Sequence, residues 1–176
     1  FPFVGLIIGI FLTLIYFIFS QFLSPMPLML IIVISEFLFT GGLHADGLMD
    51  TSDGLFSGRE RDKKLEIMKD SRVGSFGVVA FVFIILLKWQ LLAAIPTPEF
   101  IPIILVMMPL MSRYTLILSI RSYPYARKSG MGQAFAVYAP KHVITWSTIS
   151  TFCMPIIIIC NRFRYNKYTF DSIYTI

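Results

Sequence analysis

Long, almost uninterrupted apolar runs constrain the fold of this chain more than any other feature of its sequence. Of the 176 residues, 56% are hydrophobic and 14% are charged, whereas soluble domains carry about 25% charged residues. A membrane-spanning helix needs about 20 mostly apolar residues. The runs that approach this length are Phe3–Leu23, Leu28–Thr40, Ser75–Ile95, Phe100–Ile120 and Val143–Cys160.

None of these runs alternates apolar and polar residues as the strands of a transmembrane barrel do. The sequence therefore predicts an all-α protein, a polytopic transmembrane helical bundle with about five spans that forms one domain over residues 1–176. A lipid bilayer is the implied partner. The net charge of +5 needs no nucleic acid to explain it, because basic residues are expected on cytoplasmic faces. The sequence leaves a homo-oligomer open.

The segment 41–77 interrupts the apolar runs and is predicted to be one long polar cytoplasmic loop. It holds seven of the ten carboxylates and six of the fifteen cationic side chains. Basic residues also gather in 121–142, and the positive-inside tendency places both segments on the cytoplasmic side of a cell inner membrane. Three more basic residues follow the fifth run directly. The topology of the tail, residues 161–176, therefore stays open.

Three aspartates of this segment would lie on one side of a helix or of a string of tight turns. Asp46, Asp50 and Asp53 are spaced i, i+4, i+7. Carboxylates so placed repel each other unless a cation lies among them. Mg²⁺ takes oxygen ligands, commonly one or two carboxylates together with water and substrate phosphates. The pattern predicts a magnesium site, and the alternative is a solvated loop whose aspartates cap helices.

Polar residues on either side of these aspartates extend the candidate site. Glu36 lies inside the second run, where a carboxylate either snorkels, is protonated or lines the same polar site as Asp46. Gly41 and Gly42 allow a tight turn or a close approach to a ligand. For His44 three roles remain open: general base, metal ligand or ordinary hydrogen-bonding residue.

The second half of the segment predicts a short helix and a second polar cluster. Ser57 and Glu60 have the spacing of a capping box that opens a helix running to about Lys69. Asp70, flanked by Lys69 and Arg72, suits a site that holds both a metal ion and phosphate oxygens. Arg113, inside the fourth run, is either a phosphate or carboxylate partner or an ordinary positive-inside anchor.

The string GGLHADGLMDTSDGLFSGRERDKKLEIMKDSRVGSFG closely resembles the signature of the cobalamin synthase family, the adenosylcobinamide-GDP ribazoletransferases. The strings FPFVGLIIG and MSRYTLILSIRSYPYARKSGMG resemble that family's first span and second cytoplasmic loop. The likeness covers roughly residues 1 to 135. The D-x-x-D-G step is also similar to that of the CDP-alcohol phosphotransferases, whose fuller pattern is absent.

The resemblance implies a Mg²⁺-dependent membrane transferase of the last stage of cobalamin (vitamin B12) biosynthesis. Its substrates would be adenosylcobinamide-GDP and α-ribazole or α-ribazole 5′-phosphate. The ribazole hydroxyl would attack the phosphorus carried by the corrinoid side chain, and GMP would leave. Residue by residue, the expected roles are catalytic for Asp46, His44 and Asp50, phosphate-binding for Lys69, Arg72 and Arg113, and metal-binding for Asp46, Asp50, Asp53 and Asp70.

Two departures from the family lead us to expect a fragment. The family has a segment before the position of Phe1, and it has a Thr-Gly-Asp motif near its C-terminus that has no counterpart here. Two alternatives remain. A transporter of divalent cations or small solutes would place acidic residues on broken spans near the bilayer midplane, whereas the predicted loop lies outside the spans. A non-catalytic fragment would only bind partners in the membrane.

Overall fold

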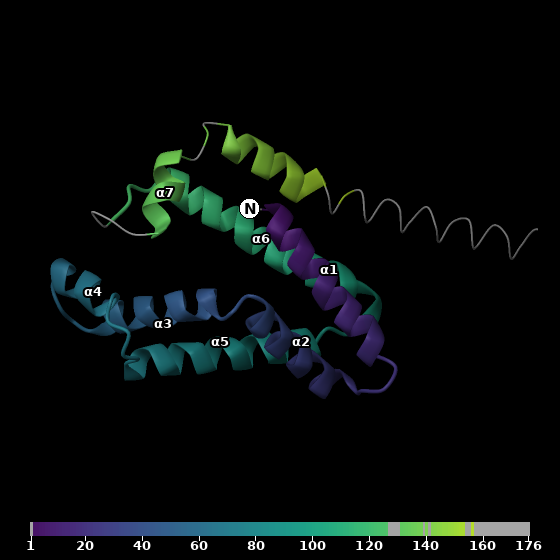
Figure 1. The fold of residues 1–176 in the computed structure, drawn as a ribbon. Helices are drawn as coiled ribbons and strands as arrows, with labels where there is room; N and C mark the ends of the chain where they lie inside the picture. Colours follow the sequence, from purple (N-terminus) through teal and green to yellow (C-terminus); the bar gives the residue numbers. More distant parts are fainter. Residues whose placement is uncertain (1, 127–130, 139, 141, 154–155, 157–176) are drawn as a thin grey trace, which may run out of the picture. The chain divides into compact units, whose positions relative to one another are not determined.

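The computed structural model describes residues 2–126, 131–138, 140, 142–153 and 156 (Figure 1). Within these ranges every regular element is helical, so the all-α prediction is confirmed. The elements are α1 Pro2–Phe19, α2 Pro25–Phe39, α3 Leu43–Phe56, α4 Arg61–Ile67, α5 Ser75–Ala93, the 3₁₀ turn η1 Pro98–Phe100, α6 Ile101–Ser122, α7 Met131–Tyr138 and a final apolar helix Val143–Cys153.

The described residues group into two compact units. The first contains residues up to Ile10 together with those from Pro102 onward, and the second is Phe11–Ile101. Each unit is described by itself below. A single membrane domain stays a prediction, and the tail 161–176 lies outside the described residues.

Three helices in the described part of the chain are long and apolar enough to cross a membrane. They are α1, α5 and the stretch Pro98–Ser122. The helices α2 and α3 pass the same test only together, and they are bent by 88° at the break between them. The helix Val143–Cys153 is shorter, and most of the remainder of the predicted fifth run lies outside the described ranges. Within the described residues the structure therefore supports three spans, or four with the bent pair, and the prediction of about five is not confirmed.

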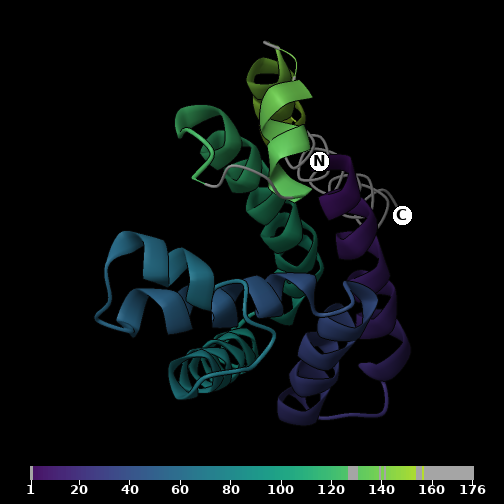
Figure 2. The ribbon, with the colours of Figure 1, turned by 60° about the vertical axis from the view of Figure 1, so that its left-hand side comes forward.

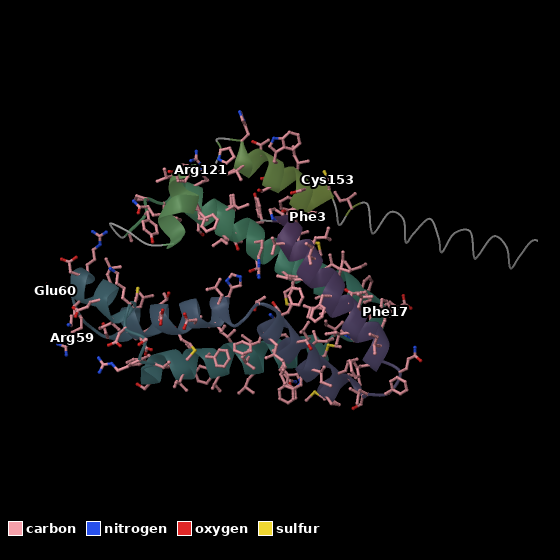
Figure 3. The ribbon with its side chains drawn as sticks, viewed as in Figure 1. Phe3, Phe17, Arg59, Glu60, Arg121 and Cys153 are labelled. Atoms are coloured by element: carbon pink, nitrogen blue, oxygen red, sulfur yellow. The ribbon has the colours of Figure 1, made fainter. Side chains whose placement is uncertain are left out.

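The outer surfaces of these helices are apolar. On α5, Phe83 is 67% exposed and Leu91 61% exposed. On α1, Phe3 and Phe17 are also exposed (Figure 3). Such a helix is stable where hydrocarbon rather than water surrounds it. These surfaces identify a membrane protein.

In the first unit, two glycines bring the start of α1 against α6. A Cβ atom at Gly5 would lie 2.6 Å from the carbonyl oxygen of Pro109, and one at Gly9 would lie 3.1 Å from that of Leu105. Small residues four apart permit this close approach of helix backbones in membranes. The final helix packs on α6 through a hydrogen bond of 3.0 Å between the hydroxyls of Tyr114 and Thr148.

In the second unit, two glycines make the sharp bend between α2 and α3. Gly41 and Gly42 have φ angles of 63° and 70°, a left-handed conformation that costs glycine little. Their N–H groups bond to the carbonyl oxygens of Leu38 and Phe37 and so close the last turn of α2. The tight turn expected at these glycines is confirmed.

The segment 41–77 is not one long loop, because it folds into α3 and α4. Gly58, with φ of 67°, separates the two helices. The expected helix toward Lys69 exists as α4, but the predicted capping box is wrong. Ser57 ends α3, donates a hydrogen bond to the carbonyl of Gly54 and accepts one from the N–H of Arg59, whereas Glu60 is the N-cap residue of α4. The left-handed glycine breaks the register that a capping box requires.

The helix α3 runs antiparallel along α5, and both views show the two side by side (Figures 1 and 2). Asp53 near the end of α3 contacts the start of α5, whereas Ala45 near its beginning shares a cleft with Lys88 near the end of α5. The expectation that these aspartates lie in a loop is wrong, because α3 is a helix. This helix packs against α5, which is a candidate span.

Candidate functional site

The acidic residues are presented by α3 as the sequence predicts. At about 100° per residue, Asp46, Asp50 and Asp53 fall within an arc of about 60° on this helix. Asp46 is exposed, and Asp50 and Asp53 are half-buried. The one-sided arrangement of the three carboxylates is therefore confirmed.

The carboxylate of Asp53 has a structural partner that the sequence does not reveal. Its two oxygens accept hydrogen bonds from the backbone N–H groups of Gly74 and Gly77, both at 2.8 Å. Gly74 is the N-cap residue of α5 and has no side chain with which to cap it. Asp53 supplies the missing cap from another helix, and its negative charge faces the positive end of the α5 dipole.

The two glycines make room for this carboxylate. A Cβ atom at either Gly74 or Gly77 would come within 3.0 Å of the Asp53 carboxylate, and at Gly77 it would also lie 2.9 Å from the carbonyl oxygen of Met49. Neither glycine has a positive φ, so space rather than backbone conformation requires them. The Gly74–Gly77 turn is thus the docking surface for Asp53.

His44 and Asp46 lie on opposite sides of the first turn of α3. Two residues correspond to about 200° around a helix. His44 lines a cleft that Asp46 does not line. The structure therefore does not bring these two predicted catalytic residues onto one face.

This cleft lies at the bend between α2 and α3, is closed on one side by α5, and is called the bend cleft below. Its volume is about 150 Å³. Four of its lining residues are polar, namely Glu36, Thr40, His44 and Lys88, and seven are apolar, including Phe37 and Phe81. Glu36 thus belongs to a polar site, but one that includes His44 and not Asp46.

Within the bend cleft, Glu36 of α2 and Lys88 of α5 form an ion pair of 2.5 Å. The side chains are 14% and 28% exposed, respectively. A carboxylate in an apolar helix needs such a partner, so the pair accounts for both charged residues. Lys88 was missed from the sequence because nothing in its local spacing indicates a partner 52 positions away.

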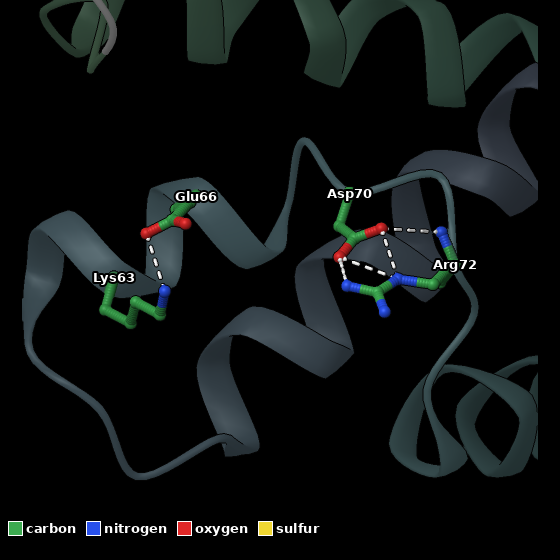
Figure 4. A network of polar contacts seen from close by, with 4 residues as sticks. All are labelled: Lys63, Glu66, Asp70 and Arg72. Atoms are coloured by element: carbon green, nitrogen blue, oxygen red, sulfur yellow. Dashed lines mark hydrogen bonds and ion pairs between the residues drawn. The ribbon is translucent and has the colours of Figure 1, made fainter.

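Asp70 and Arg72 bind each other in the turn before α5 (Figure 4). The Arg72 guanidinium donates to both carboxylate oxygens, with a shortest distance of 2.6 Å, and its backbone N–H donates at 3.1 Å. These hydrogen bonds lower the pKa of Asp70 from 3.8 to about 2 and raise that of Arg72. The pair is exposed to solvent, so its oxygens and N–H groups remain accessible to a phosphate or a metal ion.

The other two predicted phosphate ligands, Lys69 and Arg113, are not part of this ion pair. Lys69 is an exposed residue just after α4. Arg113 lies on α6 in the other unit, is 6% exposed, and donates a hydrogen bond of 3.3 Å to the hydroxyl of Ser112. A buried cation bonded to a hydroxyl group fits an intramembrane arginine better than a loop anchor.

Within the ranges described by the structure, no three His, Cys, Asp or Glu side chains are gathered to hold a metal ion. Asp53 is bound to backbone N–H groups and Asp70 to Arg72. Asp46 and Asp50 lie one turn apart on α3, and two carboxylates suffice for Mg²⁺ when substrate phosphates complete its coordination. The four-ligand set stays a prediction, and the spacing of Asp46 and Asp50 allows both carboxylates to reach one ion.

The sequence matches the model of the cobalamin-5-phosphate synthase family over residues 1–170. It is 44% identical over 144 residues to an adenosylcobinamide-GDP ribazoletransferase of Fusobacterium nucleatum, covering 77% of this chain and 52% of the relative. It is 41% identical over 138 residues to one of Desulfitobacterium hafniense, covering 77% of this chain and 54% of the relative. No solved structure matches. The chain belongs to the cobalamin-5-phosphate synthase family and spans about half the length of the curated relatives it matches.

Proposed function

We propose that this member of the cobalamin-5-phosphate synthase family takes part in the last stage of cobalamin biosynthesis as a membrane transferase. It would join adenosylcobinamide-GDP to α-ribazole or α-ribazole 5′-phosphate and release GMP. The observation that carries the proposal is the family match over residues 1–170, which contains the acidic helix α3 in full. The names of the relatives reported above support a transferase and give no support to a transporter.

The reaction exchanges a phosphoanhydride bond for a phosphoester bond. A ribazole hydroxyl attacks the phosphorus attached to the corrinoid side chain, and a new P–O bond forms. The P–O bond to GMP breaks, and the hydroxyl proton is released. Phosphoryl transfer of this kind depends mostly on positioning and on neutralising the charge of the phosphate oxygens.

Each group of polar residues has a proposed part in this reaction. Asp46 and Asp50 would hold Mg²⁺, which when bound supplies positive charge to the diphosphate. Lys69 and Arg72 would bind phosphate oxygens, since charge-assisted hydrogen bonds are the strong ones. His44 would accept the proton of the attacking hydroxyl, a task for which imidazole is the commonest side chain.

The remaining phosphate ligand and the cellular setting are also proposals. Arg113 would hold a phosphate or carboxylate group of a substrate through its buried guanidinium. The apolar helices would cross the plasma membrane, with the segments 41–74 and 121–142 facing the cytoplasm, where nucleotide substrates are found. A homo-oligomer remains open.

The proposal is tested by substituting aspartates in the protein as its native gene produces it. With adenosylcobinamide-GDP, α-ribazole and Mg²⁺ supplied in lipid nanodiscs, Asp46→Ala and Asp50→Ala should each abolish GMP release while leaving membrane insertion intact. The matched control is Asp62→Ala on the exposed surface of α4, which should retain turnover. Chelation with EDTA should stop the reaction, and added Mg²⁺ should restore it. If Asp46→Ala and Asp50→Ala both release GMP at the rate of the unmodified protein, the proposed binding of Mg²⁺ by these two residues is wrong.

A further inference from the structure

The segment 121–142, between α6 and the final apolar helix, differs in charge from the segment 41–77. It holds four cations and no carboxylate, whereas 41–77 holds six cations and seven carboxylates. The whole stretch 100–170 contains no Asp or Glu. The positive-inside tendency depends on Lys and Arg and hardly on Asp and Glu, so it does not account for this absence. A negatively charged partner does, because carboxylates would repel it.

The cations of this segment match an acidic lipid surface. They are Arg121, Arg127, Lys128 and Lys141, of which the structure describes Arg121. This residue lies in the last turn of α6, at the end of a candidate span, and is exposed (Figure 3). Clusters of four or more Lys and Arg next to a span bind anionic lipids, and each cation near the surface strengthens the binding about fivefold.

Exposed aromatic side chains accompany this charge. Tyr123 just after α6 is 73% exposed, Tyr138 at the end of α7 is 83% exposed, and Trp146 near the start of the final helix is 70% exposed. All three lie a few residues from the end of an apolar helix. Tyr and Trp are enriched at the headgroup level of membranes, where the ring and its polar group both find suitable surroundings.

The helix α7 needs support beyond its own hydrogen bonds. It has eight residues, and helices shorter than about 12 residues are marginal by themselves in water. The ring of Tyr125 packs against it so closely that a Cβ atom at Gly132 would lie 2.9 Å from the ring. In its second half, Phe135 is 50% and Val137 65% exposed. Such side chains are stabilised at the boundary between headgroups and acyl chains.

We propose that α7 and its flanking residues dock on anionic phospholipids. The apolar and aromatic side chains enter the boundary between headgroups and acyl chains, and Arg121 binds headgroup phosphates through charge-assisted hydrogen bonds. The segment 41–77 lacks an excess of positive charge and does not take part. Lipid docking is independent of the transferase reaction and is tested without substrates. The described residues of this surface, called the α7 surface, are Arg121, Tyr123, Phe135, Val137, Tyr138 and Trp146.

Hydrogen exchange in two lipids tests the docking. The protein as its native gene produces it is reconstituted in nanodiscs of phosphatidylcholine alone, or of equal parts phosphatidylcholine and phosphatidylglycerol. Amide exchange in residues 131–138 should be at least about tenfold slower with phosphatidylglycerol. Raising the salt from about 0.1 M to about 1 M should abolish the difference, because the Debye length falls from about 10 Å to about 3 Å. Residues 61–67 of α4 are the internal control and should exchange equally in both lipids.

Substitutions separate the charge of the α7 surface from its apolar contacts. Arg121→Gln should lower the preference for phosphatidylglycerol over phosphatidylcholine about fivefold in native mass spectrometry. Arg61→Gln makes the same change on the exposed surface of α4 and should leave the preference unchanged. Tyr138→Ser should accelerate exchange in residues 131–138 severalfold in phosphatidylglycerol. Its control is Phe22→Ser, 79% exposed in the uncharged link between α1 and α2, which should not change this exchange.

Three results would overturn the proposal. Residues 131–138 that exchange equally in the two lipids would contradict docking on anionic phospholipid. If Arg61→Gln lowers the lipid preference as much as Arg121→Gln does, the lipid responds to net charge alone and the α7 surface is not its site. If residues 131–138 become protected in lipid-free detergent as the protein concentration rises, a second copy of the chain covers α7 instead.

Discussion

Replacing Asp53 by asparagine separates its structural role from its predicted role as a metal ligand. In the structure, the carboxylate accepts two backbone N–H groups at 2.8 Å and caps the start of α5. Asparagine keeps one carbonyl oxygen and turns an NH₂ group toward the second N–H. One hydrogen bond to a charged group is then lost, and such bonds contribute about 1.5–3 kcal/mol.

The expected loss in the free energy of unfolding is about 2 kcal/mol, since Asp53 is half-buried. For a domain of this size each kcal/mol lowers the unfolding midpoint by about 2–4 °C. Thermal unfolding followed by circular dichroism in detergent should therefore show a decrease of about 4–8 °C. If the loss is local, hydrogen exchange at the amide of Gly77 should accelerate by roughly 20- to 30-fold.

The control is Asp46→Asn, which makes the same charge change on the exposed part of the same helix face. Its unfolding midpoint should stay within about 2 °C, because surface substitutions usually change stability by less than about 0.5 kcal/mol. Equal shifts for the two variants would refute the capping role. Turnover measured well below the unfolding midpoint tests the metal role: Asp53→Asn should retain it if the residue only caps α5, and should lose it if the residue binds Mg²⁺.

Three further outcomes follow from the same contacts. Gly77→Ala should destabilise the protein by about 1–3 kcal/mol through overpacking. Gly47→Ala, with nothing within 4 Å of the new Cβ, should instead stabilise it by about 0.5–1 kcal/mol. Equal effects of the two substitutions on the thermal unfolding midpoint would contradict the steric reasoning. Lys88→Met should lower the free energy of unfolding more than the double variant Glu36→Gln/Lys88→Met does, because only the single change leaves a half-buried carboxylate unpaired. If the effects of the two single substitutions simply add in a double-mutant cycle, the ion pair does not stabilise the fold. The folded pKa of Asp70, about 2, lies below its ordinary value of 3.8, so the small stabilisation by this exposed pair is present above about pH 4 and is lost as the pH falls toward 2; a carboxyl titration by NMR with a midpoint near 4 would contradict it.

The features that the sequence predicted correctly depend on local chemistry. Continuous apolar runs such as that in α5 leave a helix in lipid as the favoured conformation, because the backbone must satisfy its hydrogen bonds within the segment. The i, i+4, i+7 spacing places the aspartates of α3 on one side wherever that segment is helical. The string around them was enough to identify the family, since it consists of contiguous residues.

Only the tertiary structure decided which partner each polar residue has. The segment 41–77 reads as a loop because its composition is polar, yet packing against α5 stabilises α3 as a helix beside a candidate span. The sequence did not show that Asp53 caps α5, whose first residues lie 21 positions further along the chain. It also did not show that Glu36 pairs with Lys88, 52 positions away. Contacts at such separations depend on the 88° bend at Gly41 and Gly42 and on the antiparallel packing of α3 on α5. Local spacing determined the residue types of the site, and the packing of the helices determined their partners.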